Sequence, residues 1–157
     1  MSGVSKNQND NALAFLRIAV GVFFVIFGEY KVFGTAFTLH GGFESYVTRW
    51  VQHGAYPFLV SMLKNVVLEH AHAFAFAVGY GEFLIGVGLV LGILTRWAAF
   101  FGLLLMLAML FSADYPGAGA AFWQYFGASL NHSVFAVCFV AMIFGRADRA
   151  LAVRGRK

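Results

Sequence analysis

Charged residues are scarce in this sequence. They make up only 11% of its 157 residues, whereas 61% are hydrophobic, and a soluble globular domain carries about 25% charged residues. No alternation of apolar and polar residues is long enough to build a membrane-spanning β-barrel. These shortages argue against a soluble enzyme. They predict an all-α integral membrane protein, a four-helix transmembrane bundle in which residues 1–157 form a single domain in the lipid bilayer.

Cysteine is almost absent as well. The lone Cys138 lies inside an apolar run, so the chain can form neither an internal disulfide nor a CxxC redox pair. A self-contained thiol–disulfide enzyme is thereby excluded. The sequence also lacks a phosphate-binding glycine loop, a GxSxG nucleophile motif and an HExxH motif. We therefore expect no metal. A haem held by His72 and His132 is geometrically conceivable, but we do not expect one.

Five of the 11 basic residues gather at the C-terminus. The formal net charge is +4, and the C-terminal cluster is Arg146, Arg149, Arg154, Arg156 and Lys157. Such an asymmetry is typical of cytoplasmic ends of membrane proteins, and not of a nucleic-acid-binding surface. It predicts a bacterial-type inner (plasma) membrane protein with both termini cytoplasmic and no nucleic-acid partner. Binding of anionic lipid or of an acidic partner is the alternative use of the cluster.

Apolar runs long enough to cross a bilayer, which takes roughly 20 residues, define the expected spans: 12–33, 72–94, 96–113 and 130–145. The second and third spans meet at a tight turn, Thr95-Arg96. The outside loop 34–71 has apolar residues at helical spacing, which predicts two short amphipathic helices. Gly54 should end the first of these helices, and Pro57 should begin the second.

Glu82 stands in the middle of the second span. A carboxylate near the bilayer midplane costs about 2.5–3.5 kcal/mol on insertion scales, so it should be protonated, paired or functional. Arg17 in the first span is a candidate partner. It either extends to the membrane surface or turns inward, and an offset in depth of about 5–10 Å then separates it from Glu82. We treat Glu82 as the first catalytic candidate, with Arg17 and Gly86 beside it as cofactor-binding candidates.

A second set of polar residues marks the outer ends of the first and fourth spans. Glu29 and Lys31 close the first span, while Asn131 and His132 open the fourth. Residues at similar depth in neighbouring helices lie about 8–10 Å apart. We therefore expect Glu29, Lys31 and His132 to converge around a small polar ligand, with His132 carrying protons. The alternative is that each side chain points separately to the lipid headgroups.

Two motifs resemble a known family. The first is Leu16-Arg17-Ile18 followed by Gly21, Phe24 and Gly28-x-x-Lys31. The second is Gly81-Glu82-x3-Gly86-x-Gly88-Leu89-x2-Gly92-x2-Thr95-Arg96. Together they resemble the first two spans of DoxX-like membrane proteins, a family that includes the DoxD and DoxA subunits of thiosulfate:quinone oxidoreductase. The resemblance implies a four-helix inner-membrane protein in which Arg17, Lys31, Glu82 and Arg96 hold the family's polar positions. His132 departs from the family, which often has an acid there.

Three hypotheses for the function follow. The first is a small inner-membrane subunit of a redox-linked complex that binds quinone or quinol near Glu82. The second is a non-catalytic accessory or scaffold subunit, and the third is a small transporter. The expected partners are other protein subunits or a second copy of the chain. A quinone is the one candidate cofactor.

Overall fold

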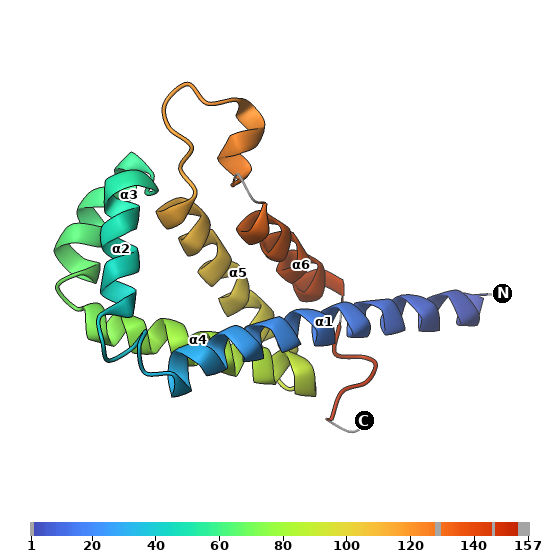
Figure 1. The fold of residues 1–157 in the computed structure, drawn as a ribbon. Helices are drawn as coiled ribbons and strands as arrows, with labels where there is room; N and C mark the ends of the chain where they lie inside the picture. The colour runs from blue at the N-terminus through green and yellow to red at the C-terminus, as the bar shows by residue number, and fades with distance from the viewer. Residues whose placement is uncertain (1, 128–129, 146, 154–157) are drawn as a thin grey trace.

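The computed structural model describes residues 2–127, 130–145 and 147–153, and it confirms the all-α fold. Figure 1 shows the arrangement of its elements. In chain order they are α1 (Ser2–Phe33), α2 (Gly42–His53), α3 (Pro57–Met62), the π-helical turn η1 (Leu63–Val67), α4 (Ala71–Leu91), α5 (Thr95–Ala113), the 3₁₀ turn η2 (Phe122–Phe126) and α6 (Asn131–Gly145).

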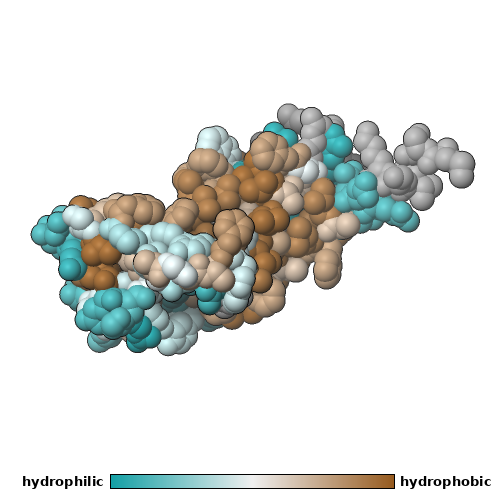
Figure 2. Space-filling model, turned by 90° about the horizontal axis from the view of Figure 1, so that it is seen from above, coloured by the Kyte–Doolittle hydropathy of each residue, from teal (hydrophilic) through white to brown (hydrophobic). Residues whose placement is uncertain are grey.

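Three of the described helices are long and apolar enough to cross a membrane, namely Gln8–Phe33 within α1, α4 and α5. The fourth helix, α6, is apolar but has only 15 residues. Figure 2 shows apolar residues over the middle of the molecule and hydrophilic residues toward its two ends. Side chains such as Phe27, Leu84 and Val137 are more than half exposed, and in a membrane protein such a surface faces lipid. The chain is therefore a helical bundle built for a bilayer.

Helices α1 and α4 pack most closely, and glycines allow it. A Cβ atom added at Gly28 would lie 2.5 Å from the backbone nitrogen of Phe83, and one added at Gly86 would lie 2.5 Å from that of Val25. Neither position has room for a side chain, so the two backbones touch. These contacts also fix the antiparallel register of the pair, with Gly28 opposite Phe83.

The link between α4 and α5 lies earlier than the sequence predicts. Helix α4 ends at Leu91, because Gly92 adopts a left-handed conformation with φ of 72°, which glycine adopts without steric cost. Thr95 and Arg96 then belong to the first turn of α5, so the connection is made by residues 92–94. The prediction that the second span continues to Leu94 is wrong for this reason.

Helices α5 and α6 form a second antiparallel pair, inclined to the α1–α4 pair (Figure 1). The ring of Phe139 lies directly over Gly102, and Phe24 of α1 meets the same ring edge-on at a centroid distance of 5.2 Å. Phe139 is fully buried. It therefore joins α1, α5 and α6 into one apolar core.

The two amphipathic helices predicted in the first loop are present. Helix α2 ends at His53, before Gly54, and α3 begins at Pro57, as the sequence indicates. Their apolar side chains form a second core against the start of α4, in which Phe43, Val47 and Ala75 are buried. This layer covers the end of α4 that extends beyond the end of α1.

Candidate functional site

Glu82 pairs with Lys31. The Lys31 ammonium donates to both carboxylate oxygens, at 2.6 Å to Oε1 and 2.5 Å to Oε2. The Glu82 side chain is 8% exposed and that of Lys31 is 21% exposed. Burying either charge alone would be costly, and each partner lowers that cost for the other. The pair is thus an ion pair inside the α1–α4 interface that solvent or a ligand can still reach on the lysine side.

The register of α1 against α4 explains why Lys31 is the partner and Arg17 is not. Since Gly28 lies opposite Phe83, Lys31 lies within a turn of Glu82. Arg17 lies about four turns before Lys31 in α1, roughly 21 Å along the axis. The expected offset of 5–10 Å between Arg17 and Glu82 is too small. That offset assumes that the two spans end at the same depth, whereas α4 begins well beyond the point where α1 ends.

Arg17 turns inward at the opposite end of the bundle. It is fully buried, and its Nη2 donates to the carbonyl oxygens of Leu151 at 2.7 Å and Ala150 at 3.5 Å. Its Nη1 packs against Gly92. Nε and Nη1 find no hydrogen-bond partner among the described residues. Arg17 therefore holds the C-terminal segment 147–153 against the α4–α5 turn, where Val153 also donates to the Leu91 carbonyl.

His132 has a different partner from the one expected. Its Nδ1 lies 2.6 Å from Oδ2 of Asp114, which joins the end of α5 to the start of α6. Figure 1 shows the end of α1 and the start of α6 at separate places. The two pairs, Lys31–Glu82 and His132–Asp114, take the place of the single cluster of Glu29, Lys31 and His132 that the sequence predicts.

The other predicted residues lie outside these pairs. Glu29 is exposed on α1, and Asn131 is exposed at the first residue of α6. Gly86 is buried against α1 and serves the close helix contact already described. Arg96 is exposed in the first turn of α5.

A tyrosine cluster adjoins the Asp114–His132 pair. The ring of Tyr56 lies 4.9 Å from that of Tyr115 between centroids, and its hydroxyl donates to the Tyr125 carbonyl at 3.0 Å. Burial raises the pKa of Tyr56, and the neighbouring Tyr125, Asp114 and Tyr115 raise it further. The cluster fastens the segment between α5 and α6 to the start of α3.

The sequence does not predict that two further residues, Phe37 and Thr38, lie next to Lys31. The ring of Phe37 lies under the Lys31 ammonium, 5.1 Å from Nζ to the ring centroid, a distance typical of a cation–π contact. Thr38 is buried, and a Cβ atom added at Gly79 would meet both the Lys31 Cβ at 3.3 Å and the Thr38 Cγ2 at 3.6 Å. Both residues come from the irregular segment 34–41, where no periodic pattern signals a role. Asp114 could have been found, because it is the only acid between α5 and α6.

Within the described part of the chain, no three residues of the His, Cys, Asp and Glu types gather as metal ligands would. A family model described as DoxX matches residues 12–114. This range contains Arg17, Lys31, Glu82 and Asp114, and it ends before α6. Comparison with curated protein sequences and with solved structures finds no match to the chain.

Proposed function

The chain belongs to the DoxX family of membrane proteins, and from that premise we propose that it is a small inner-membrane subunit of a redox-linked complex that binds quinone at the Lys31–Glu82 pair. One observation carries the proposal: a buried ion pair stands inside a helix interface, and its lysine remains 21% exposed. Intramembrane ionisable residues mark ligand or proton pathways by default.

The donor set suits a quinone headgroup. Lys31 can donate a hydrogen bond to a carbonyl oxygen, and Glu82 can accept a proton from a hydroxyl group. Exposed apolar side chains on the outer faces of the same helices, such as Phe33 on α1 and Leu84 on α4, can hold an isoprenoid tail. A bound quinone would supply two-electron, two-proton redox chemistry. The electrons require a partner subunit, because the single cysteine of the chain cannot form a redox pair.

Quinone content tests the proposal. The protein is purified in mild detergent, and quinone is extracted and quantified per polypeptide for the wild type, Lys31→Met and Glu82→Leu. Lys64→Met and Glu69→Leu are matched controls, because these two charges are exposed. We expect quinone in the wild type and both controls, and its loss from both variants of the pair. Equal quinone in all five proteins, or none in the wild type, contradicts the proposal.

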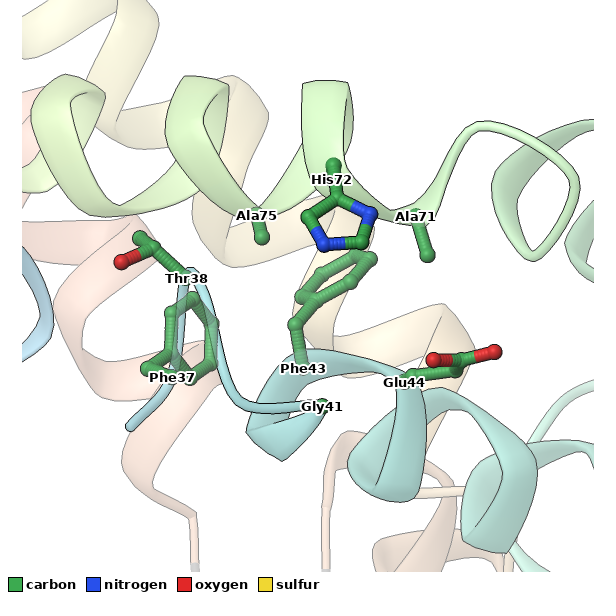
Figure 3. Close-up of a pocket in the computed structure, with 8 residues that line it drawn as sticks. All are labelled: Phe37, Thr38, Gly41, Phe43, Glu44, Ala71, His72 and Ala75. Atoms are coloured by element: carbon green, nitrogen blue, oxygen red, sulfur yellow. The ribbon is translucent and has the colours of Figure 1, made fainter. Parts of the chain in front are cut away.

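An accessory role without catalysis is the second candidate, and a different observation favours it. The two charges of the pair already satisfy each other. A cavity lined by Phe37, which also contacts Lys31, has a volume of only about 10 Å³ (Figure 3), the space of about one water. In this role the pair fastens α1 to α4, and the bundle holds other subunits. Partner subunits that remain bound to a quinone-free Lys31→Met/Glu82→Leu double variant would favour the accessory role.

The orientation in the membrane belongs to the same proposal. We place both termini and the α4–α5 turn in the cytoplasm. Arg96 and the basic C-terminal cluster are positively charged, and positively charged residues of membrane proteins concentrate on the cytoplasmic side. On a Cys138→Ser background, Ile93→Cys should resist an impermeant thiol reagent added outside intact cells, and Ser45→Cys on α2 should react. The reverse pattern would overturn this orientation.

A further inference from the structure

Buried polar atoms without a hydrogen-bond partner gather at one end of the bundle. They are Nε and Nη1 of Arg17 and Oγ1 of Thr95, and no other buried side-chain nitrogen or oxygen of the described residues lacks a partner. Arg17 is fully buried, and Thr95 is 3% exposed. A buried polar group without a partner is unfavourable, and a buried charge is more so. This end of the bundle therefore offers donors that the described chain does not use.

The positive charge of Arg17 is not neutralised by an acid. Arg17 takes part in neither of the two ion pairs of the described residues. Asp148 is close enough to act on its charge, but Asp148 is exposed and forms no ion pair with it. Nη2 donates instead to the carbonyl oxygens of Leu151 and Ala150. Burial of a charge is compensated well only when an opposite charge is paired with it, so Arg17 lacks a bound anion.

The first turn of α5 adds a second attraction for an anion. The Ala98 N–H is the first of α5 to donate to a carbonyl of the preceding turn, that of Leu94, and the N–H groups of residues 95–97 have no partner within the helix. The N-terminus of a helix carries a partial positive charge and binds phosphate groups. Nη1 of Arg17 packs against Gly92, three residues before Thr95, so the guanidinium is directed at this turn.

Segment 147–153 occupies the place from which an anion would reach Arg17. The Leu151 carbonyl lies 2.7 Å from Nη2, and a Cβ atom added at Gly92 would lie 2.6 Å from the Ala152 Cβ. The segment and the α4–α5 turn thus leave no room for an anion between them. Leu151 is held weakly, because its φ of 52° is unfavourable for a residue other than glycine and its side chain is 68% exposed. An anion can therefore bind when the segment leaves.

We propose that Arg17, Thr95 and the first turn of α5 form a binding site for a phosphate group, and that segment 147–153 closes this site. In the closed state the Leu151 carbonyl stands in for a phosphate oxygen. In the open state phosphate oxygens accept hydrogen bonds from the guanidinium, the Thr95 hydroxyl and the free N–H groups, and the phosphate neutralises Arg17. The phosphate belongs to a lipid headgroup or is the free ion. The site does not involve the Lys31–Glu82 pair, so it is independent of quinone binding.

Hydrogen exchange at the Val153 amide reports whether the segment is closed, because this N–H donates to the Leu91 carbonyl in the closed state. The protein is kept in dodecyl maltoside in a phosphate-free buffer. Exchange is measured with dioctanoyl phosphatidylglycerol and with dioctanoylglycerol, which has the same acyl chains but no phosphate. It is also measured with inorganic phosphate and with sodium chloride at the same ionic strength. Bound lipid per polypeptide is counted by native mass spectrometry, and bound phosphate by equilibrium dialysis.

We expect dioctanoyl phosphatidylglycerol to bind to the wild type and to speed exchange at Val153. The acceleration should be about tenfold at a free lipid concentration of about ten times the dissociation constant, because a ligand of the open state raises its population in that proportion. Dioctanoylglycerol and sodium chloride should leave the rate unchanged. Acceleration by inorganic phosphate as well identifies the free ion as a ligand, and acceleration by the lipid alone assigns the phosphate to a headgroup.

Three variants identify the residues that hold the phosphate. Arg17→Leu should lose the bound lipid, and Thr95→Val should bind it about tenfold more weakly or worse, because a hydrogen bond to a charged group is lost. Thr95→Val keeps the side-chain volume, so it decides the question if Arg17→Leu fails to fold. Arg96→Leu is the matched control. It removes an exposed arginine next to Thr95 and should bind the lipid as the wild type does.

Any of three results would overturn the inference. The first is phosphatidylglycerol that does not bind, or that binds without speeding exchange at Val153. The second is an equal acceleration by dioctanoylglycerol, which would show an effect of the acyl chains. The third is lipid binding that is unchanged in Thr95→Val, or that falls as much in Arg96→Leu as in Arg17→Leu. None of these results bears on quinone content, so the proposed function would stand or fall separately.

Discussion

Loss of Lys31 should destabilise the protein more than loss of Glu82, although both changes break the same ion pair. Lys31→Met leaves the Glu82 carboxylate at 8% exposure, and a lone acid in an apolar interior costs about 2.5–3.5 kcal/mol. We therefore expect a loss of about 3 kcal/mol. Glu82→Leu leaves an ammonium near the end of α1, from which a long side chain can extend to the membrane surface, so we expect about 1 kcal/mol.

The double variant separates pairing from other effects. Replacing both partners of a buried pair by apolar residues is often neutral, so Lys31→Met/Glu82→Leu should be within about 1 kcal/mol of the wild type. The coupling energy in the double-mutant cycle is then about 4 kcal/mol. Unfolding of the protein in mixed micelles with increasing dodecyl sulfate, followed by far-ultraviolet circular dichroism, measures each free energy.

An exposed pair of charges provides the control. Lys64→Met and Glu69→Leu remove charges that are exposed and form no ion pair among the described residues, so their effects should add within about 0.5 kcal/mol. Additive effects of Lys31→Met and Glu82→Leu, with each loss below about 1 kcal/mol, would refute the reasoning. The pair would then be no stronger than a surface contact.

Three further predictions concern other parts of the structure. Gly28→Ala should lower the free energy of unfolding by about 1–3 kcal/mol through overpacking against Phe83. Gly81→Ala, whose added methyl group meets no neighbouring atom, should be neutral or stabilising by up to about 1 kcal/mol. The same micelle titration measures both changes. Arg17→Leu should speed amide hydrogen exchange in segment 147–153 by about tenfold or more, since a hydrogen bond to a charged group contributes about 1.5–3 kcal/mol, and unchanged exchange contradicts the role of Arg17. The raised pKa of Tyr56 favours its neutral form in the folded protein. This contribution to stability is present below about pH 10 and is lost as the pH rises through the folded pKa. Unfolding curves should therefore show that the free energy of unfolding falls less at alkaline pH in Tyr56→Phe than in the wild type.

Much of the fold could be predicted from local signals. Apolar runs located the long helices, and Gly54 and Pro57 located the boundary between α2 and α3. Each of these signals is a property of a few neighbouring residues. The end of α4 was missed because Gly92 is apolar enough to continue a span, and only its left-handed conformation ends the helix.

The partners of the buried charges could not be predicted in the same way. Both Arg17 and Lys31 lie on the face of α1 that carries Gly21 and Gly28, so helical periodicity cannot choose between them. The choice depends on the register of α1 against α4, which is set by contacts between residues far apart in the sequence, such as Gly28 with Phe83. The contact of Phe37 with Lys31 has the same origin, since it joins an irregular segment to a helix.

The coupling between the Lys31 side-chain nitrogen and the Glu82 carboxyl carbon tests the central claim most directly. Solid-state magnetic resonance can measure this dipolar coupling in lipid vesicles, with and without a soluble short-chain quinone. No other Lys–Glu ion pair occurs in the described residues, so the signal is specific. We predict a strong coupling in the absence of quinone that weakens as quinone is added and engages Lys31. Absence of the coupling contradicts the structure of the site, and a coupling unchanged at saturating quinone contradicts its function.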